Sequence, residues 1–111
     1  MGYRMKRGDI YWVNLNPTIG SEISKLRPCV LIGATPINKA RRTVVVVPLS
    51  SSTTARPPLT IAVDCLGKPA IAICDQVRTV DKSRLQQNAA GSLSDSDLNA
   101  LEEGLRQVFC L

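Results

Sequence analysis

The sequence contains no histidine and no closely spaced pair of cysteines. Without histidine it cannot form a Ser-His-Asp or Cys-His catalytic site. Its four cysteines are widely separated, so the paired ligands of a typical zinc site are missing. The glycine-rich patterns Gly-x-x-x-x-Gly-Lys-Ser/Thr and Gly-x-Gly-x-x-Gly, which bind nucleotide phosphates, are also absent. We therefore expect no metal ion and no cofactor.

Long apolar runs are missing too. None approaches the roughly 20 residues that a helix needs to cross a bilayer, and the basic N-terminal stretch is not followed by the apolar core of a signal peptide. We expect a cytoplasmic protein that forms one domain over 1–111 and does not bind a membrane. The net charge of +5, with more arginine than lysine, favours a polyanion or an acidic protein segment as partner.

Short apolar, β-branched runs separated by turn residues predict a mainly β fold. The run TVVVVPL at 43–49 is typical of a central strand buried on both faces. Ser94 and Asp97 resemble a capping box, and apolar residues at helical spacing follow them. The pattern predicts a compact, mostly antiparallel barrel with one C-terminal helix. Strands are expected at 10–15, 27–33, 43–49, 59–63, 69–74 and 77–80, with a turn at 35–38 and one helical turn within 81–87.

A long polar loop at 16–26 separates the first two expected strands. Connections between neighbouring strands usually need about two to five residues, and this one has roughly twice that. It carries charged side chains and is followed at once by Arg27. On position alone, a binding or catalytic loop and a long mobile hairpin are equally good interpretations.

The remaining side chains suit metal-free chemistry on RNA, which carries its own nucleophile, the 2′-hydroxyl. An enzyme then needs only to remove that proton, stabilise the extra negative charge on phosphorus and protonate the leaving oxygen. An arginine supplies the charge stabilisation, which is usually the largest contribution. Carboxylate and hydroxyl groups can transfer protons, although less readily at neutral pH than histidine.

Five motifs occur in an order that resembles the MazF/PemK/Kid family of toxin–antitoxin ribonucleases. The similarity covers 5–110 and includes the opening strand RGDIYWV and the loop pattern NPTIGSE. The other three motifs are Arg27-Pro28 before an apolar strand, VPLS at 47–50 and DQVR at 75–78. Each motif alone is weak evidence, whereas the five in this order are fairly specific.

This resemblance implies an SH3-like barrel of the CcdB/PemK type that forms a homodimer. It also implies sequence-specific cleavage of single-stranded RNA without a metal ion, leaving 2′,3′-cyclic phosphate and 5′-hydroxyl ends. A cognate antitoxin with an acidic segment would block the site, which suits the basic charge of the chain.

The resemblance also implies roles for individual residues. Arg27 matches the catalytic arginine, and Ser50 stands where many members have a threonine that is catalytic or contacts phosphate. Glu22 matches a loop glutamate that acts as a base or contacts the antitoxin. Asp75 matches the general base of the Kid branch, and the general base stays open among Glu22, Ser50 and Asp75. The residues expected to contact RNA are Thr18, Ser21, Lys25, Ser51, Asp75, Gln76 and Arg78.

Two departures weaken a Kid-type mechanism. The acid of that branch is an arginine two positions before the aspartate, where this chain has Ile73, and its loop histidine is replaced by Ser21. We therefore expect a MazF-type arrangement around Arg27 and Ser50, with 16–26 as a flap beside the RNA groove. Trp12 is expected to pack in the core or against a partner subunit, and base stacking is the alternative.

Two other functions remain as alternatives. CcdB toxins, which poison DNA gyrase, share this barrel and have no ribonuclease activity. A degenerate homologue would bind RNA or antitoxin without cutting. The matches at Arg27-Pro28, Ser50 and Glu22 favour the ribonuclease, because a gyrase-binding toxin has no need of them.

Overall fold

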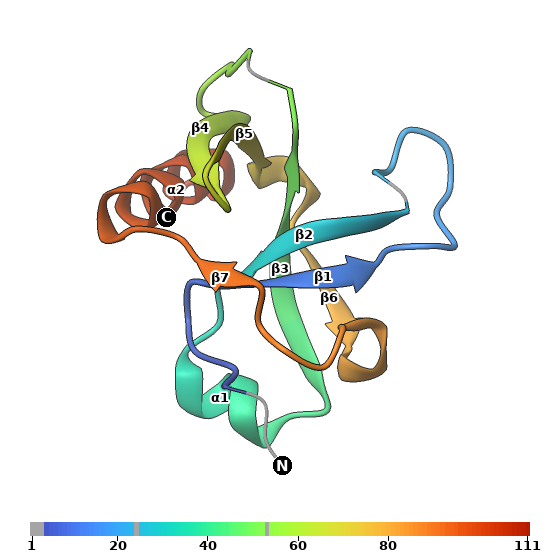
Figure 1. Cartoon of the computed structure of the whole chain (residues 1–111). Helices are drawn as coiled ribbons and strands as arrows, with labels where there is room; N and C mark the ends of the chain where they lie inside the picture. Colours follow the sequence, from blue (N-terminus) through green and yellow to red (C-terminus); the bar gives the residue numbers. More distant parts are fainter. Residues whose placement is uncertain (1–3, 24, 53) are drawn as a thin grey trace.

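The computed structural model describes residues 4–23, 25–52 and 54–111. Within these ranges the chain forms an antiparallel, strongly curved sheet with one long helix packed across one side, as Figure 1 shows. The strands are β1 (Asp9–Asn14), β2 (Leu26–Leu31), β3 (Thr43–Ser50), β4 (Thr60–Cys65), β5 (Lys68–Ile73), β6 (Arg78–Asp81) and β7 (Gly91–Ser92). The helices are α1 (Thr35–Ala40) and α2 (Asp95–Phe109), with two 3-10 turns, η1 (Cys74–Gln76) and η2 (Lys82–Arg84).

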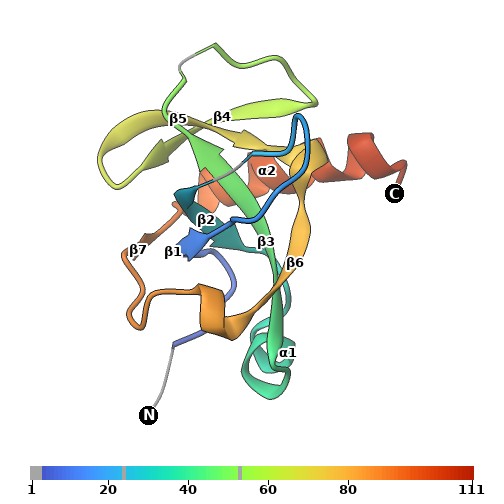
Figure 2. The same cartoon turned by 90° about the vertical axis from the view of Figure 1, so that its right-hand side faces the viewer.

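The strand order is β4-β5-β3-β2-β1-β7, and β6 also pairs with β3. β3 connects the two halves of the sheet, because its first half pairs with β6, its residues 46–48 pair with β2, and its last two residues pair with β5. Figure 2 shows β3 running the length of the molecule. The expected mostly antiparallel fold with a C-terminal helix is confirmed.

The sheet separates two apolar clusters, and β3 contributes to both. Val44 and Val46 pack on one face of it, whereas Val47 and Leu49 belong to the cluster on the other. β-branched residues suit such a strand, because their side chains fill both sides of a pleated surface. The expectation that 43–49 is a central strand buried on both faces is confirmed.

The segment 35–38 was expected to form a turn, and this prediction is wrong: it begins the short helix α1. Pro36 lies in the first helical turn, where a proline costs no hydrogen bond. The side chain of Asn38 is buried and donates to the backbone oxygens of Met5, at 3.2 Å, and Gly33, at 2.8 Å. These two contacts fix α1 against the N-terminal segment.

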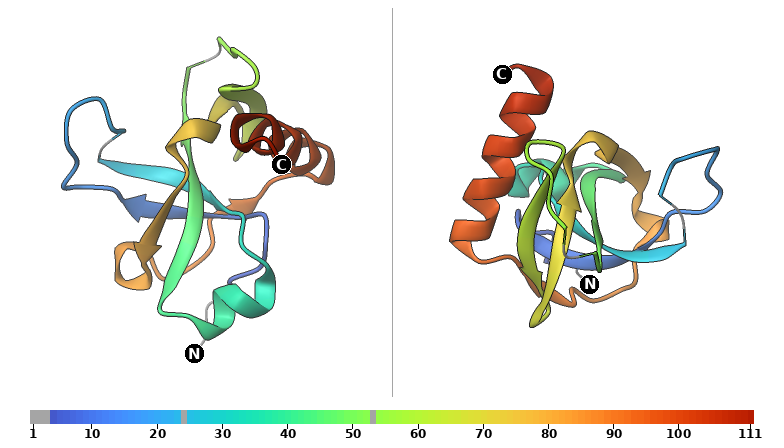
Figure 3. Two further views of the ribbon diagram at one scale, coloured as in Figure 1. Left: turned by 180° about the vertical axis from the view of Figure 1, so that it is seen from behind. Right: turned by 90° about the horizontal axis from the view of Figure 1, so that it is seen from above.

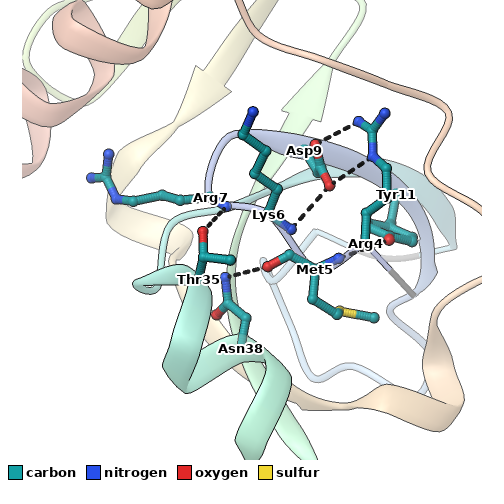
Figure 4. A network of polar contacts seen from close by, with 8 residues as sticks. All are labelled: Arg4, Met5, Lys6, Arg7, Asp9, Tyr11, Thr35 and Asn38. Atoms are coloured by element: carbon teal, nitrogen blue, oxygen red, sulfur yellow. Dashed lines mark hydrogen bonds and ion pairs between the residues drawn. The ribbon is translucent and has the colours of Figure 1, made fainter. Parts of the chain in front are cut away.

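A polar network ties the N-terminal segment to β1 (Figure 4). The fully buried carboxylate of Asp9 accepts from the Arg4 guanidinium at 2.6 Å and from the backbone nitrogen of Lys6 at 3.0 Å. Its hydrogen bond and negative charge raise the pKa of Arg4. The Tyr11 hydroxyl accepts from the backbone nitrogen of Met5 at 3.3 Å. The buried charge is therefore paired, as buried carboxylates require.

Ser94 caps α2 as expected, its hydroxyl accepting from the backbone nitrogen of Asp97 at 3.1 Å. The carboxylate of Asp97 turns instead to the backbone nitrogen of Asp64 at 2.8 Å and so joins the helix to β4. Leu101 is fully buried, whereas Phe109, expected on the same apolar stripe, is 49% exposed near the helix end. No helix among the described residues is long and apolar enough to cross a membrane.

Gly104 lies where α2 comes closest to the sheet. A Cβ atom at this position would meet Ile61 of β4 at 2.8 Å and the sulfur of Cys74 at 3.0 Å. Glycine weakens an isolated helix by about 1 kcal/mol relative to alanine. Here it permits close contact between helix and sheet, so tertiary packing outweighs the local preference.

Candidate active site

Arg27, Ser50 and Ser51 lie together around a cavity of about 480 Å³, which we call the Arg27 pocket. Arg27 comes from β2, opposite Val13 of β1, and Ser50 ends β3, opposite Ile71 of β5. The start of β2 and the end of β3 thus bring a cation and two hydroxyl groups to one place. The pocket is lined by Trp12, Leu26, Arg27, Pro28, Leu49, Ser50, Ser51, Cys65, Leu66, Lys68, Pro69 and Ala70.

Most of this lining is apolar. Trp12 is half-buried and stands opposite Pro28 in the strand register, so it forms a wall of the pocket. Trp12 was expected to pack in the core or against a partner subunit, with base stacking as the alternative. The β4–β5 hairpin, which sequence analysis did not associate with the site, adds Leu66 and Lys68. An apolar wall beside cations and hydroxyl groups fits an unstacked base next to its phosphate.

A second cavity of about 450 Å³, which we call the Asp75 pocket, lies between the β1–β2 loop and η1. It collects most of the other predicted site residues, including Glu22, so Glu22 does not line the pocket that holds Arg27 and Ser50. The lining residues are Ser21, Glu22, Asp75, Gln76, Val77 and Arg78.

Two predicted site residues hold the loop in place. The side-chain oxygen of Gln76 accepts from the backbone nitrogen of Ile23 at 2.6 Å, which joins η1 to the loop. The carboxylate of Glu22 accepts from the backbone nitrogen of Ile19 at 2.7 Å, within the loop itself. Both side chains therefore have a structural role that sequence analysis did not identify.

The remaining predicted residues, Thr18 and Lys25, line neither pocket. Lys25 closes the base of the loop through its backbone: its oxygen accepts from the nitrogen of Leu15, and its nitrogen donates to the side chain of Asn16, both at 3.0 Å. It does so at a φ of +73°, in the left-handed region that costs most residues about 1 kcal/mol or more.

The Asp75 pocket lacks the acid of the Kid branch. Ile73, at the corresponding position, is half-buried and pairs with Thr60 of β4. The cation that lines this pocket is Arg78, whose guanidinium also donates to the backbone oxygen of Leu15 at 3.4 Å. The pocket thus pairs an exposed carboxylate, Asp75, with an arginine that the backbone already engages.

The thiol of Cys29 in β2 feels the charge of one arginine from each pocket. Burial raises the pKa of the Cys29 thiol to about 12, and the positive charges of Arg78 and then Arg27 oppose that rise. One arginine lines each pocket, so both act on the same buried sulfur. Within the described ranges, no group of three or more His, Cys, Asp or Glu residues is arranged to hold a metal ion.

Comparison with known proteins places this chain in context. A family model described as "PemK-like, MazF-like toxin of type II toxin-antitoxin system" matches residues 6–109. The chain is 31% identical over 106 residues to Endoribonuclease MazF of Staphylococcus saprophyticus, covering 91% of this chain and 88% of that protein.

Solved structures match the fold over nearly the whole chain. MazF from Deinococcus radiodurans superposes with a TM-score of 0.86 at 20% identity, covering 99% of this chain and 100% of the other. A mycobacterial endoribonuclease in complex with its cognate antitoxin gives a TM-score of 0.76 at 21% identity, covering 96% and 95% of the two chains. At these identities the structural similarity establishes the fold.

Proposed function

This chain belongs to the family of PemK-like, MazF-like toxins of type II toxin–antitoxin systems and is a MazF-like endoribonuclease, and we propose that it cuts single-stranded RNA at the Arg27 pocket without a metal ion. The observation that carries this proposal is the common cavity of Arg27 and Ser50, because a guanidinium beside a hydroxyl group is suited to bind a phosphate. The apolar wall around Trp12 supports it, because a bound phosphate brings a base with it.

In the proposed reaction, the 2′-oxygen attacks the adjacent phosphorus. The 2′-O–P bond forms, the P–O5′ bond breaks, and the products are a 2′,3′-cyclic phosphate and a 5′-hydroxyl group. A base takes the 2′-hydroxyl proton, and a proton passes to the departing 5′-oxygen. Arg27 stabilises the charge that builds up on the phosphoryl oxygens, while Ser50 orients the same phosphate. The candidates for the base are Ser50 in the Arg27 pocket and Glu22 and Asp75 in the second pocket, and the kcat values of the corresponding variants decide between them.

We propose different roles for the two pockets. The Arg27 pocket holds the scissile phosphate. The Asp75 pocket, with carboxylate, amide and guanidinium groups, binds neighbouring nucleotides by their base edges and phosphates. Contacts with both pockets make cleavage sequence-specific. Ser51 would contact the RNA from within the Arg27 pocket, and Thr18 and Lys25 from outside both pockets.

We further propose that the chain acts as a homodimer in the cytoplasm, where its RNA substrate is found, and that an antitoxin with an acidic segment blocks it. The net charge of +5 supports an acidic partner. The mycobacterial structure similar in fold is a complex with a cognate antitoxin.

The experiment is incubation of the purified chain with mixed-sequence single-stranded RNA in excess EDTA, followed by sequencing of the new 5′ ends. We expect cuts at one short sequence, 5′-hydroxyl ends and cyclic phosphate on the upstream fragment. Cleavage lost in EDTA and restored by a divalent ion would refute the metal-free reaction. RNA binding without cleavage would instead identify a degenerate homologue, and inhibition of DNA gyrase would favour the CcdB-like alternative.

A further inference from the structure

The segment after β6 carries an arginine that lines neither pocket. Arg84 ends η2, and its guanidinium donates to the backbone oxygen of Asn14, at 3.1 Å, and to that of Asn16. Asn14 ends β1 and Asn16 follows just after it, at the start of the loop; Figure 1 shows the turn after β6 beside the end of β1. One side chain therefore bridges the point where the strand becomes the loop.

Arg84 is itself fixed by the residues that follow it. Leu85 is buried and forms an antiparallel bridge with Val13 of β1. The backbone nitrogen of Gln86 donates to the backbone oxygen of Trp12 at 2.9 Å. Before it, the carboxylate of Asp81 caps η2. The backbone that carries Arg84 is consequently joined to β1 by the residues after it and capped by Asp81 before it.

The same stretch of backbone is supported by a second arginine. Arg78 donates to the oxygen of Leu15, which lies between the two carbonyls that Arg84 holds. Leu15 and Asn16 in turn bind the backbone of Lys25 at the other end of the loop. The two arginines thus reach the one place where both ends of the loop meet. Figure 3 shows this loop on the side of the molecule opposite α2.

We propose that Arg84 is a positioning residue for RNA binding: its guanidinium fixes the base of the 16–25 loop and, through it, the backbone that presents Ser21 and Glu22 to the Asp75 pocket. This inference rests on the proposed RNA cleavage, since it gives the loop geometry a role in substrate binding. A planar guanidinium offers several donors in a fixed arrangement to two carbonyls, whereas a lysine ammonium is a compact charge on a flexible stem.

The test compares Arg84→Gln and Arg84→Lys with Lys82→Gln as the matched control. Lys82 lies in the same 3-10 turn, but its ammonium donates to the backbone oxygen of Lys39 in α1, away from the loop. KM and kcat are measured on a short single-stranded RNA that contains one mapped cut site. Amide hydrogen exchange is measured over 16–25 without RNA.

We expect Arg84→Gln to raise KM about tenfold, as for the loss of a charge-assisted hydrogen bond, with kcat within about twofold. Exchange at the Lys25 amide should become faster. Arg84→Lys should recover part of both losses, and Lys82→Gln should match the wild type. If Arg84→Gln does not fold, the same shifts in Arg84→Lys, of smaller size, carry the test.

Several results would overturn the proposal. One is an unchanged rate of amide exchange over 16–25 in Arg84→Gln. Another is a fall in the kcat of Arg84→Gln at constant KM. A third is an equal effect of Lys82→Gln, which would show that the loss of positive charge alone is responsible. Failure of the wild-type chain to cut RNA would refute the proposed function. The exchange measurements would then still decide whether Arg84 fixes the loop.

Discussion

The Arg27 pocket and the Asp75 pocket are built differently. The first is formed by the ends of strands and a hairpin, with a mostly apolar wall around one arginine and two hydroxyl groups. The second is formed by a loop and a 3-10 turn, and its polar groups, Gln76 and Arg78, already bind loop backbone. A pocket on strands holds a group in a fixed place, whereas a pocket on a loop is better suited to recognition.

The largest effect that this comparison predicts is on Arg27. Arg27→Ala should reduce kcat by about 10²–10³-fold or more, because the arginine acts on charge that develops in the transition state. The measurement is single-turnover cleavage of a short RNA, with thermal unfolding as the check on folding. Arg27→Lys keeps the charge and loses the planar donors, so it should recover only part of the rate. Near-normal cleavage by a folded Arg27→Ala protein would show that RNA is not cut at the Arg27 pocket.

A smaller loss is expected at Ser50. Ser50→Ala should reduce kcat about 10- to 100-fold by removing a donor from the phosphate, whereas Ser50→Thr, which keeps the hydroxyl, should stay close to the wild type. Steady-state kinetics on the same RNA measure both variants. A negligible effect of the alanine would show that the Ser50 hydroxyl has no role in the reaction.

The smallest effect on kcat is expected in the other pocket. If Asp75 binds nucleotides and is not the base, Asp75→Asn should change kcat by no more than about threefold and mainly raise KM, whereas loss of a general base costs about 10²–10⁴ in rate. Glu22→Gln is the parallel variant, and kcat values at saturating RNA distinguish the two outcomes. A large loss of kcat in either variant would place the base in the Asp75 pocket and remove the proposed division of roles.

Much of the fold could be predicted from the sequence, because the strands carry a local signal. β-branched runs and turn residues located most strands to within one or two residues, and Ser94 located the start of α2. The short helix α1 was missed because six residues have little helical preference of their own. Its Asn38 is held by the backbone of Met5, a contact from a distant part of the chain.

The site was predicted less completely. Motif resemblance identified Arg27, Ser50 and Asp75 along the chain, but their separation into two cavities depends on strand register and on the path of the loop. Lys68 gave no signal, since one lysine after a turn is commonplace. Arg84 gave none either, because its role comes from backbone carbonyls about 70 residues earlier in the chain.

The glycine in α2 bears on how such a toxin can change its target during evolution. Gly104 lets the helix touch β4, and β4 continues into the hairpin turn that lines the Arg27 pocket. A larger residue at 104 would push β4 and α2 apart. The contact between helix and sheet therefore tolerates few substitutions. Lys68, at the exposed tip of the hairpin, has a solvent-facing side chain, so we expect a substitution there to disturb packing less than one at Gly104. New sequence preferences would therefore arise most readily at that tip.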